Sequence, residues 1–389
     1  MALKFTTRLA GQPLRQVWAA GQDVYACGPN GFYISTDYGN TFVRRTTADG
    51  LGDNSCYSFY VRYDRHISTA AATYGQSVNK SRIYVATKFG LNGGNTDNGT
   101  NFGPGGYTVK DGLPDNCVLG VIGAGTATLL ATLKGICMST GDLGLQPFVR
   151  IANAATNSAM GASYDIDRSD YIDDYGENKP CSGSTWLFVD PIQVNALCVA
   201  ASSGLFISLN GGGDPGKTTN WWASYGMKEG LADTSAVAAM IVPGNGGSTG
   251  QPGGSVKSPA TYYAATKRGL SISQYYRPTA PNGNAAPPAG VNSKYNMWFK
   301  TITDRGMPNN SLQAVYVYGK DIYVGHQALS PTVGGLSVSS NNGTSFTNYN
   351  VANSGLASND VRWIHAPTVA SGSTPKFYVA TSNGLSISV

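Results

Sequence analysis

The densest group of side chains that could bind a metal ion lies in an acidic stretch, YDIDRSDYIDDYGENKPC, which begins at residue 164. Its carboxylates include Asp165, Asp167, Asp170 and Asp173. Oxygen ligands at this density suit Ca²⁺, but the spacing departs from the EF-hand loop, because Asp170 stands where that loop has its invariant Gly. We therefore prefer a solvated acidic loop, keep a calcium site as the alternative, and expect no cofactor.

Aromatic residues beside Arg and Asn form a second kind of candidate site. The segment QYYRPTAPNGNAAPPAGVNSKYNMW carries Tyr275, Tyr276 and Arg277. Exposed rings of this kind can stack on a sugar or anchor a protein partner. Trp221 and Trp222 are neighbours, so one is expected to pack and the other to be exposed. With Tyr74, these residues are the predicted ligand-binding set; the alternative is that the Pro-rich loop only covers an edge of the fold.

The sequence gives little support for a catalytic site. The three histidines (His66, His326 and His365) are far apart in the sequence, and neither G-x-S-x-G nor H-E-x-x-H occurs. The six cysteines show no C-x-x-C spacing. Five of them lie in apolar, strand-like runs, which favours buried thiols over a disulfide framework. We expect no catalytic residue and no enzymatic activity.

Composition excludes several classes of partner. The net charge of +5 arises without a Lys/Arg cluster, so nucleic-acid binding is not expected. No apolar stretch reaches the roughly 18 residues of a membrane span, so no membrane insertion is expected. The N-terminus has no apolar core of a signal peptide. Low charge with abundant Gly, Asn, Thr and Tyr is nevertheless typical of proteins outside cells, which suggests a virion protein or a secreted protein whose signal was removed.

A repeat supplies the elements that must position these residues. One phrase recurs seven times as a short apolar strand, a Gly-containing turn and a second strand, for example RIYVATKFGLNGG at 82, TYYAATKRGLSIS at 261 and KFYVATSNGLSIS at 376. Between the copies lies an aromatic-led strand, then G-L-x-x-N, then an apolar strand, as in YTVKDGLPDNCVLGVIG at 107. Together the phrases predict a four-stranded unit of propeller-blade length.

The repeat begins and ends half-way through a unit, which predicts a circular closure. We expect a single-domain, all-β, seven-bladed propeller of four-stranded antiparallel blades over residues 1–389, in which the N-terminal strand completes the last blade. Closure removes the free sheet edge of an open array. The predicted blades are 14–47, 55–110, 116–152, 184–225, 234–303, 311–350, and 359–389 plus 3–9, with an insertion at 153–183.

The turn STDYGNTF at 35 follows a pattern of its own, with Asp37 able to bond the backbone ahead and Gly39 able to take a positive φ. Similar turns stand at Asp97 and Gly99, and at Asn341 and Gly343. The pattern S-x-D-x-G-x-T-F resembles the Asp-box, which is repeated in propellers such as sialidases, sortilin-type receptors and xyloglucanases. The resemblance implies the fold and a structural turn. The sialidase motif F/Y-R-I-P is absent, so their activity is not implied.

Loop insertions locate the expected working surface. Most of them join the first strand to the second, or the third to the fourth, and these connections share one face of a propeller. We expect a non-catalytic recognition or assembly module on a virion, of phage tail or fibre type, or on a cell surface, with glycans or protein neighbours as partners. The alternatives are a secreted glycoside hydrolase and an intracellular interaction scaffold.

Overall fold

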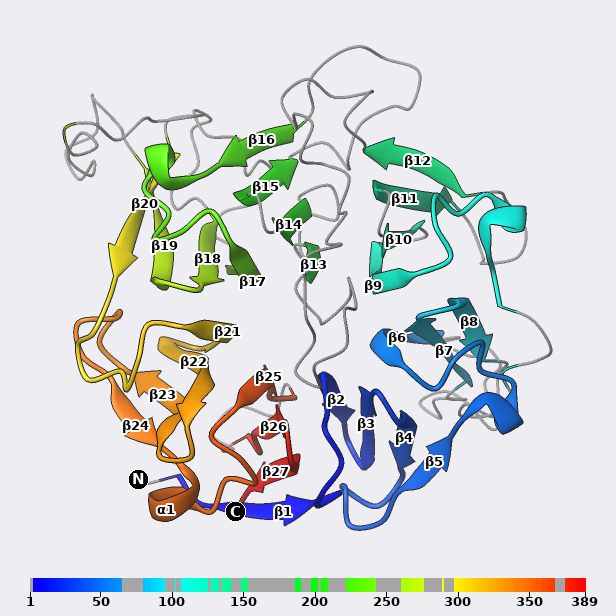
Figure 1. The fold of residues 1–389 in the computed structure, drawn as a ribbon, viewed down its shortest axis with the longest axis horizontal. Coiled ribbons are helices and arrows are strands. Elements are labelled where there is room, and N and C mark those ends of the chain that lie inside the picture. Colours follow the sequence, from blue (N-terminus) through cyan, green and yellow to red (C-terminus); the bar gives the residue numbers. More distant parts are fainter. Residues whose placement is uncertain are drawn as a thin grey trace, which may run out of the picture.

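The alternating apolar repeats fold into seven antiparallel sheets arranged as a ring (Figure 1). The computed structural model describes residues 3–64, 80–94, 102, 106–124, 127–132, 135–140, 148–152, 186–189, 197–201, 204–208, 222–242, 260–275, 289, 297–367 and 375–389. Helix is confined, in this part of the chain, to α1 (Val351–Ser354) and to single turns of 3-10 helix. The predicted all-β, seven-bladed propeller is confirmed.

Each blade places its first strand innermost, around the axis of the ring (Figure 1). Blade 1 contains β2 (Gln16–Ala20), β3 (Asp23–Gly28), β4 (Gly31–Ser35) and β5 (Val43–Arg45). Blade 2 contains β6 (Cys56–Asp64), β7 (Lys80–Thr87) and β8 (Gly90–Gly94). Blade 3 contains β9 (Val118–Ala124), β10 (Ala127–Thr132), β11 (Gly135–Thr140) and β12 (Val149–Ala152).

The remaining blades repeat this order. Blade 4 contains β13 (Trp186–Val189), β14 (Leu197–Ala201), β15 (Gly204–Ser208) and β16 (Trp222–Tyr225). Blade 5 contains β17 (Ala236–Val242), β18 (Thr261–Thr266), β19 (Gly269–Tyr275) and β20 (Met297–Ile302). Blade 6 contains β21 (Leu312–Tyr318), β22 (Asp321–Ser330), β23 (Val333–Ser339) and β24 (Thr347–Tyr349).

Blade 7 closes the ring with strands from both ends of the chain. Its inner strands are β25 (Val361–His365), β26 (Tyr378–Thr381) and β27 (Gly384–Ser388), and its outermost strand is β1 (Phe5–Arg8). β1 pairs antiparallel with β27, from Phe5 opposite Ser388 to Arg8 opposite Leu385. The N-terminal strand therefore completes the last blade, as the half-units of the repeat predicted.

Blade 2 departs from the four-stranded pattern. Among the described residues its outer strand is reduced to one isolated bridge between Leu91 and Tyr107. The residue directly before Tyr107 is Gly106, and Gly weakens a strand.

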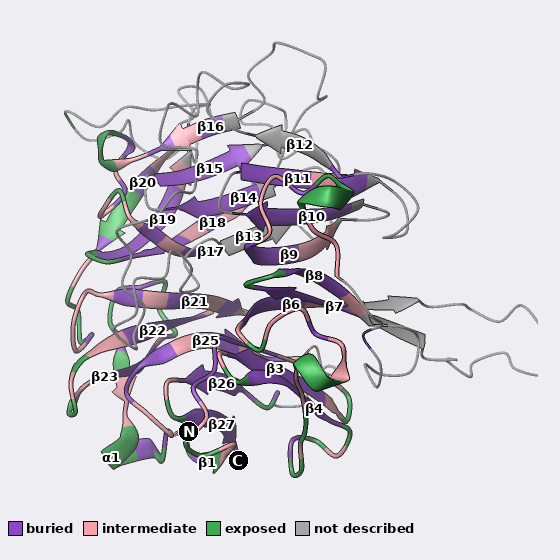
Figure 2. Ribbon diagram, turned by 45° about the vertical axis from the view of Figure 1, so that its right-hand side comes forward, coloured by how far each residue is buried: buried purple, intermediate pink, exposed green. Residues whose placement is uncertain are grey.

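The core lies between the blades, because alternate residues of a strand point to opposite faces. In blade 1, Tyr25 and Phe32 face blade 2, where the rings of Phe32 and Phe59 lie 5.1 Å apart. Val24 and Tyr33 face blade 7 and belong to a second buried cluster. Figure 2 shows the result: the described inner strands are largely buried, and exposure is concentrated on loops and outer strands.

Five cysteines confirm the expectation of buried thiols. The side chains of Cys27, Cys56, Cys117, Cys137 and Cys198 are all buried. Burial raises the pKa of the Cys27 thiol to about 12. Thiols of this kind are inert. Cys181 lies outside the described residues.

Candidate recognition site around the ring axis

The predicted ligand-binding residues fall at or beyond the limits of what the structure describes. Tyr275 is the last residue of β19 and Trp222 the first of β16, and only their backbones are described. The remaining candidates lie outside the described residues: Tyr74, Trp221, Tyr276, Arg277, Asp165, Asp167, Asp170, Asp173, Asp97 and Gly99. No cluster of potential metal ligands occurs among the residues that are described.

The turn at 35–42 is held together by the carboxylate of Asp37. Its oxygens accept hydrogen bonds from the backbone N–H of Asn40 (3.0 Å) and Thr41 (2.9 Å) and from the hydroxyls of Ser35 and Thr41 (both 2.7 Å). These donors favour the ionised form and lower the pKa of Asp37 to about 2. The carboxylate therefore organises the turn.

Blade 6 contains a sister turn at 339–345, built on an amide in place of the carboxylate. Asn341 Oδ1 accepts from the hydroxyl of Ser339 (2.9 Å) and from the N–H of Ser345 (2.9 Å). Gly39 and Gly343 both adopt positive φ, of 82° and 77°. A Cβ on either glycine would lie within 2.7 Å of an isoleucine in the adjoining blade, Ile387 for Gly39 and Ile302 for Gly343. Both turns thus pack against the preceding blade.

The G-L-x-x-N phrase forms the loop that leads into the innermost strand of a blade, hereafter the leading loop. In blade 3, Thr108 and Asp111 form a reciprocal capping box around a one-turn 3-10 helix (Val109–Asp111), and Gly112 ends it with a φ of 94°. Asn116 Oδ1 then accepts the N–H of Val109 at 2.9 Å. The same contacts recur around Thr46 in blade 2 and, with Asn350 as the cap, in blade 7.

The innermost strand, which follows the leading loop, pairs irregularly at its start. The register shifts directly after the first residue in blades 2, 3, 5, 6 and 7. A bulge leaves one residue without a ladder partner and re-aims its side chain. The bulged residues, hereafter the bulge ring, are Tyr57, Leu119, Val237, Gln313 and Arg362.

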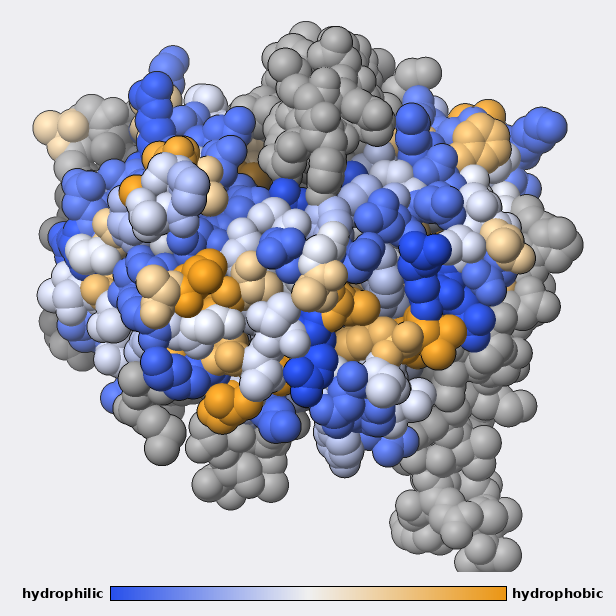
Figure 3. Space-filling view, turned by 60° about the horizontal axis from the view of Figure 1, so that its bottom comes forward, coloured by the Kyte–Doolittle hydropathy of each residue, from blue (hydrophilic) through white to orange (hydrophobic). Residues whose placement is uncertain are grey.

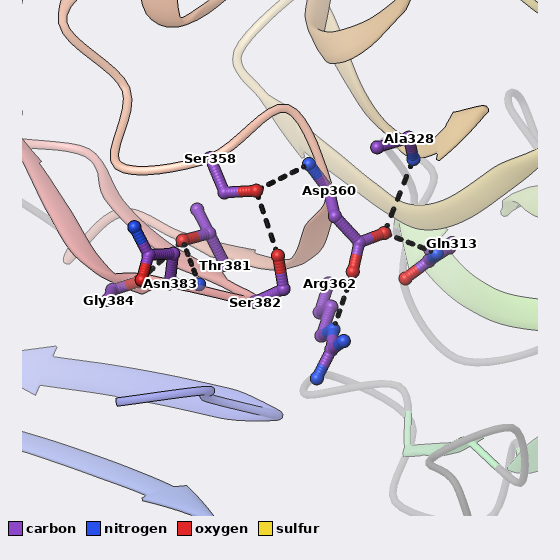
Figure 4. A network of polar contacts seen from close by, with 9 residues as sticks. All are labelled: Gln313, Ala328, Ser358, Asp360, Arg362, Thr381, Ser382, Asn383 and Gly384. Carbon is purple, nitrogen blue, oxygen red and sulfur yellow. Dashed lines mark hydrogen bonds and ion pairs between the residues drawn. The ribbon is translucent and has the colours of Figure 1, made fainter. Parts of the chain in front are cut away.

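A polar network joins the bulge ring of blades 6 and 7 (Figure 4). Asp360 accepts hydrogen bonds from Gln313 Nε2 at 2.7 Å and from Arg362 Nε at 2.9 Å. The exposed fractions of the Arg362 and Asp360 side chains are only 9% and 12%. Beside this pair, Ser358 and Ser382 share a hydrogen bond of 2.8 Å. Both oxygens of the carboxylate are thus bound by protein donors.

A cation–aromatic contact joins blades 1 and 2 around the axis. Arg15 donates to Ser55 Oγ and to the carbonyl of Cys56, both at 3.0 Å, and its guanidinium lies 4.4 Å from the ring centroid of Tyr57. Gln16 exchanges two hydrogen bonds with the backbone of Phe59. The guanidinium of Arg15 in blade 1 therefore stabilises the position of blade 2.

Two histidines lie in the inner part of the blades. His326 Nε2 is 2.8 Å from Ser337 Oγ, and both residues are fully buried. His365 Nε2 is 3.0 Å from the carbonyl of Ala19, which requires a proton on that nitrogen. Burial lowers the pKa of each to about 4. Both imidazoles are therefore neutral at pH 7, and the Ser337–His326 pair is closed to substrate.

In the described part of the chain, hydrogen-bonding, cationic and aromatic groups around the axis contact one another between blades. Sequence reasoning missed the bulge ring. The sequence does contain a signal for it. Each bulged residue stands three positions after the Asn of G-L-x-x-N, or after the residue that replaces this Asn. At that position the other blades have apolar or aromatic residues, whereas blades 6 and 7 have Gln313 and Arg362. The phrase is evident in the sequence, but its register against the next strand is not.

No known family model matches the chain, and no curated protein does. Among solved structures, it is similar to the extracellular domain of the hybrid two component system BT3049 from B. thetaiotaomicron (TM-score 0.60, 12% identity, 100% of this chain and 41% of that one). It is also similar to YCF48 from Cyanidioschyzon merolae (0.57, 13%, 100% and 98%). An ancestral GH74 enzyme gives a TM-score of 0.50 at 15% identity, over 99% of this chain and 46% of that one.

These likenesses establish the class of protein, a β-propeller, and nothing narrower. The chain spans about two fifths of the length of the B. thetaiotaomicron domains that it matches. None of the described helices is long and apolar enough to cross a membrane.

Proposed function

We propose that this protein is a non-catalytic recognition or assembly module that works outside the cell, on a virion or on a cell surface, and binds glycans or protein neighbours. The observation that carries the proposal is that the polar groups around the axis are engaged in fixing blades to one another. Asp360 holds Gln313 and Arg362, and Arg15 holds Ser55 and Tyr57. A rigid ring of this kind presents loops without reacting itself.

The same observation weakens the alternative of a glycoside hydrolase. Such enzymes need two carboxyl groups flanking the substrate. In the described leading loops, Asp111 and Glu229 close capping boxes, and Asp53, Asp115 and Asp233 each accept the N–H two residues ahead. We propose further that the two turns at 35–42 and 339–345 are Asp-boxes, because their side-chain hydrogen bonds follow the S-x-D/N-x-G pattern.

The test is binding of the purified protein to a broad glycan array, together with hydrolysis assays on xyloglucan and sialylated substrates. We expect binding without hydrolysis, and we expect Tyr275→Ala/Tyr276→Ala to weaken glycan binding if the aromatic insertion is the contact surface. Turnover that is abolished by Asp360→Asn, in a variant that still folds, would show that the protein is an enzyme. Absence from virions and cell surfaces at the native source would favour the intracellular scaffold.

A further inference from the structure

The seam between blades 7 and 1 presents a set of cationic, polar and aromatic side chains. β1 and β5 are the outermost strands of these blades, so each leaves one edge unpaired. The residues on this seam, hereafter the seam site, are Thr6, Arg8, Tyr38, Asn40 and Arg44. Thr6, Tyr38, Asn40 and Arg44 are exposed, and Arg8 is half-buried.

Tyr38 is the most informative member of the seam site. Its φ is +63°, in the left-handed region that bulky residues rarely adopt. The sister turn of blade 6 places Asn342 at the same position, with a φ of +55°, and Asn tolerates this conformation well. The exposed fraction of Tyr38 is 54%, so the ring is not needed to fill the core. A residue that suits neither the backbone nor the core points to a contact outside the protein.

The turn also holds Tyr38 firmly in place. Its N–H donates to the carbonyl of Gln22 at 2.8 Å, and the residue before it is Asp37, whose carboxylate ties the turn together. A tyrosine has few rotatable bonds, so an anchored one contacts a partner at a low entropic cost.

Charge on the seam has one predominant sign. Arg8 Nη2 donates to Asn40 Oδ1 at 3.3 Å and reaches across from β1 to the turn of blade 1. Arg44 lies opposite Tyr33, whose side chain belongs to the cluster facing blade 7, so Arg44 is on the seam side of its blade. The carboxylate of Asp37 points into its own turn. Asp23 shares the face of Tyr25, which lies towards blade 2, so it does not neutralise the seam.

We propose that the seam site docks an extended acidic segment of a partner protein. The two guanidinium groups would bind carboxylates, which they match in geometry, and Tyr38 would be the anchor. The unpaired edges of β1 and β5 offer backbone groups that an extended polypeptide can pair with, as in strand addition. Figure 3 shows this side as a mixed surface, on which blue hydrophilic groups border a narrow band of apolar ones, rather than the broad apolar contact that a lipid surface requires. The inference rests on the proposed recognition function and assigns it a surface.

The test uses the full chain and a fluorescent random copolymer of glutamate and tyrosine as the probe, with fluorescence anisotropy as the readout. Two variants address the site: Tyr38→Asn, which installs the residue of the sister turn, and Arg44→Gln. Phe89→Asn is the matched control, because Phe89 is equally exposed (55%) but lies in the turn between β7 and β8. Thermal unfolding is measured for all of them.

We expect Tyr38→Asn to keep or raise the melting temperature and to weaken copolymer binding about tenfold, which corresponds to about 1.4 kcal/mol. Arg44→Gln should weaken binding and reduce its dependence on salt, whereas Phe89→Asn should bind like the parent protein. A clear drop in melting temperature for Tyr38→Asn would show that this tyrosine is structural and overturn the proposal.

Further measurements distinguish an acidic polypeptide from other partners, and the seam proposal from the broader recognition function. Binding of alginate or of phosphatidylserine vesicles, without binding of the copolymer, would overturn the proposal in favour of a carboxylated glycan or a membrane. Copolymer binding that is equal in all variants would also overturn it. If the protein does not bind the copolymer but binds glycans on the array, the seam proposal fails and the recognition function stands.

Discussion

Replacing Phe5 with alanine tests whether the ring is closed by the N-terminal strand. Phe5 is 7% exposed and belongs to a buried cluster with Leu336 of blade 6 and with Ile364 and Val379 of blade 7. Truncation of a buried Phe to Ala typically costs about 3–5 kcal/mol. We expect the lower end of this range, about 3 kcal/mol, because β1 lies at an edge where the cavity can partly collapse. That is a large fraction of the roughly 5–15 kcal/mol that stabilises a typical protein.

The assay is urea unfolding followed by tryptophan fluorescence, which reports on blades 1 and 7 through Trp18 and Trp363. Thr7→Ala is the control, because Thr7 lies on the same strand and is exposed. We expect the midpoint of Phe5→Ala to fall and that of Thr7→Ala to stay. Equal midpoints for parent and Phe5→Ala would refute the closure, since an unattached N-terminus has no reason to stabilise residues near 364.

Four more predictions follow from single contacts. The pKa of Asp37 is lowered to about 2 in the folded protein. The ionised carboxylate therefore stabilises the fold above the unfolded pKa near 4, and this stabilisation is lost as the pH falls towards 2. The melting temperature of Asp37→Asn should depend less on pH in that window than the melting temperature of the parent protein. Gly343→Ala places a Cβ 2.5 Å from Ile302 and should destabilise by about 1–2 kcal/mol, whereas Gly319→Ala meets nothing within 4 Å and should cost less; equal costs in chemical denaturation would contradict this account. Asp360→Ala removes the carboxylate that binds the nearly buried Arg362 and should lower the free energy of unfolding by about 3 kcal/mol, whereas Ser382→Ala beside it should cost much less. His326 has a pKa of about 4 in the folded protein, below its usual 6.5, so folding favours its neutral form. The stability of the protein therefore falls as the pH drops from 6.5 towards 4. The decrease in melting temperature between pH 7 and pH 5 should be smaller for His326→Thr than for the parent protein.

Much of the fold could be predicted because the repeat carries its own geometry. The alternation of apolar residues specifies strands, the recurring glycines specify turns, and the two half-units at the chain ends imply closure. The turn at 35–42 could also be predicted, since the hydrogen bonds that the Asp37 carboxylate accepts are all local. The candidate site around the axis could not be predicted. Whether Gln313 bulges, and whether it meets Asp360 of the next blade, depends on packing between blades, which no local pattern encodes.

The same distinction explains an arrangement in blade 6 that resembles a catalytic pair. In blades 5 and 7 the third strand carries Ser271 or Ser386, and its hydroxyl accepts the N–H of Ala232 or Ala357 in the leading loop, both at 2.9 Å. Blade 6 has Pro308 at that loop position, and proline has no N–H to donate. Its Ser337 lies instead 2.8 Å from His326, at the place where Thr266 and Thr381 bond the turn glycine in those blades.

A missing donor in the leading loop therefore accompanies a changed partner on the adjacent strand. Blade 3 shows the same coupling, because Pro114 occupies its loop position and the buried Cys137, a weak hydrogen-bonding residue, replaces the serine. Ser337 and His326 thus satisfy each other's hydrogen bonding inside blade 6. Both side chains are completely buried, as that structural role requires, whereas Tyr38 on the seam between blades 7 and 1 is exposed to a partner.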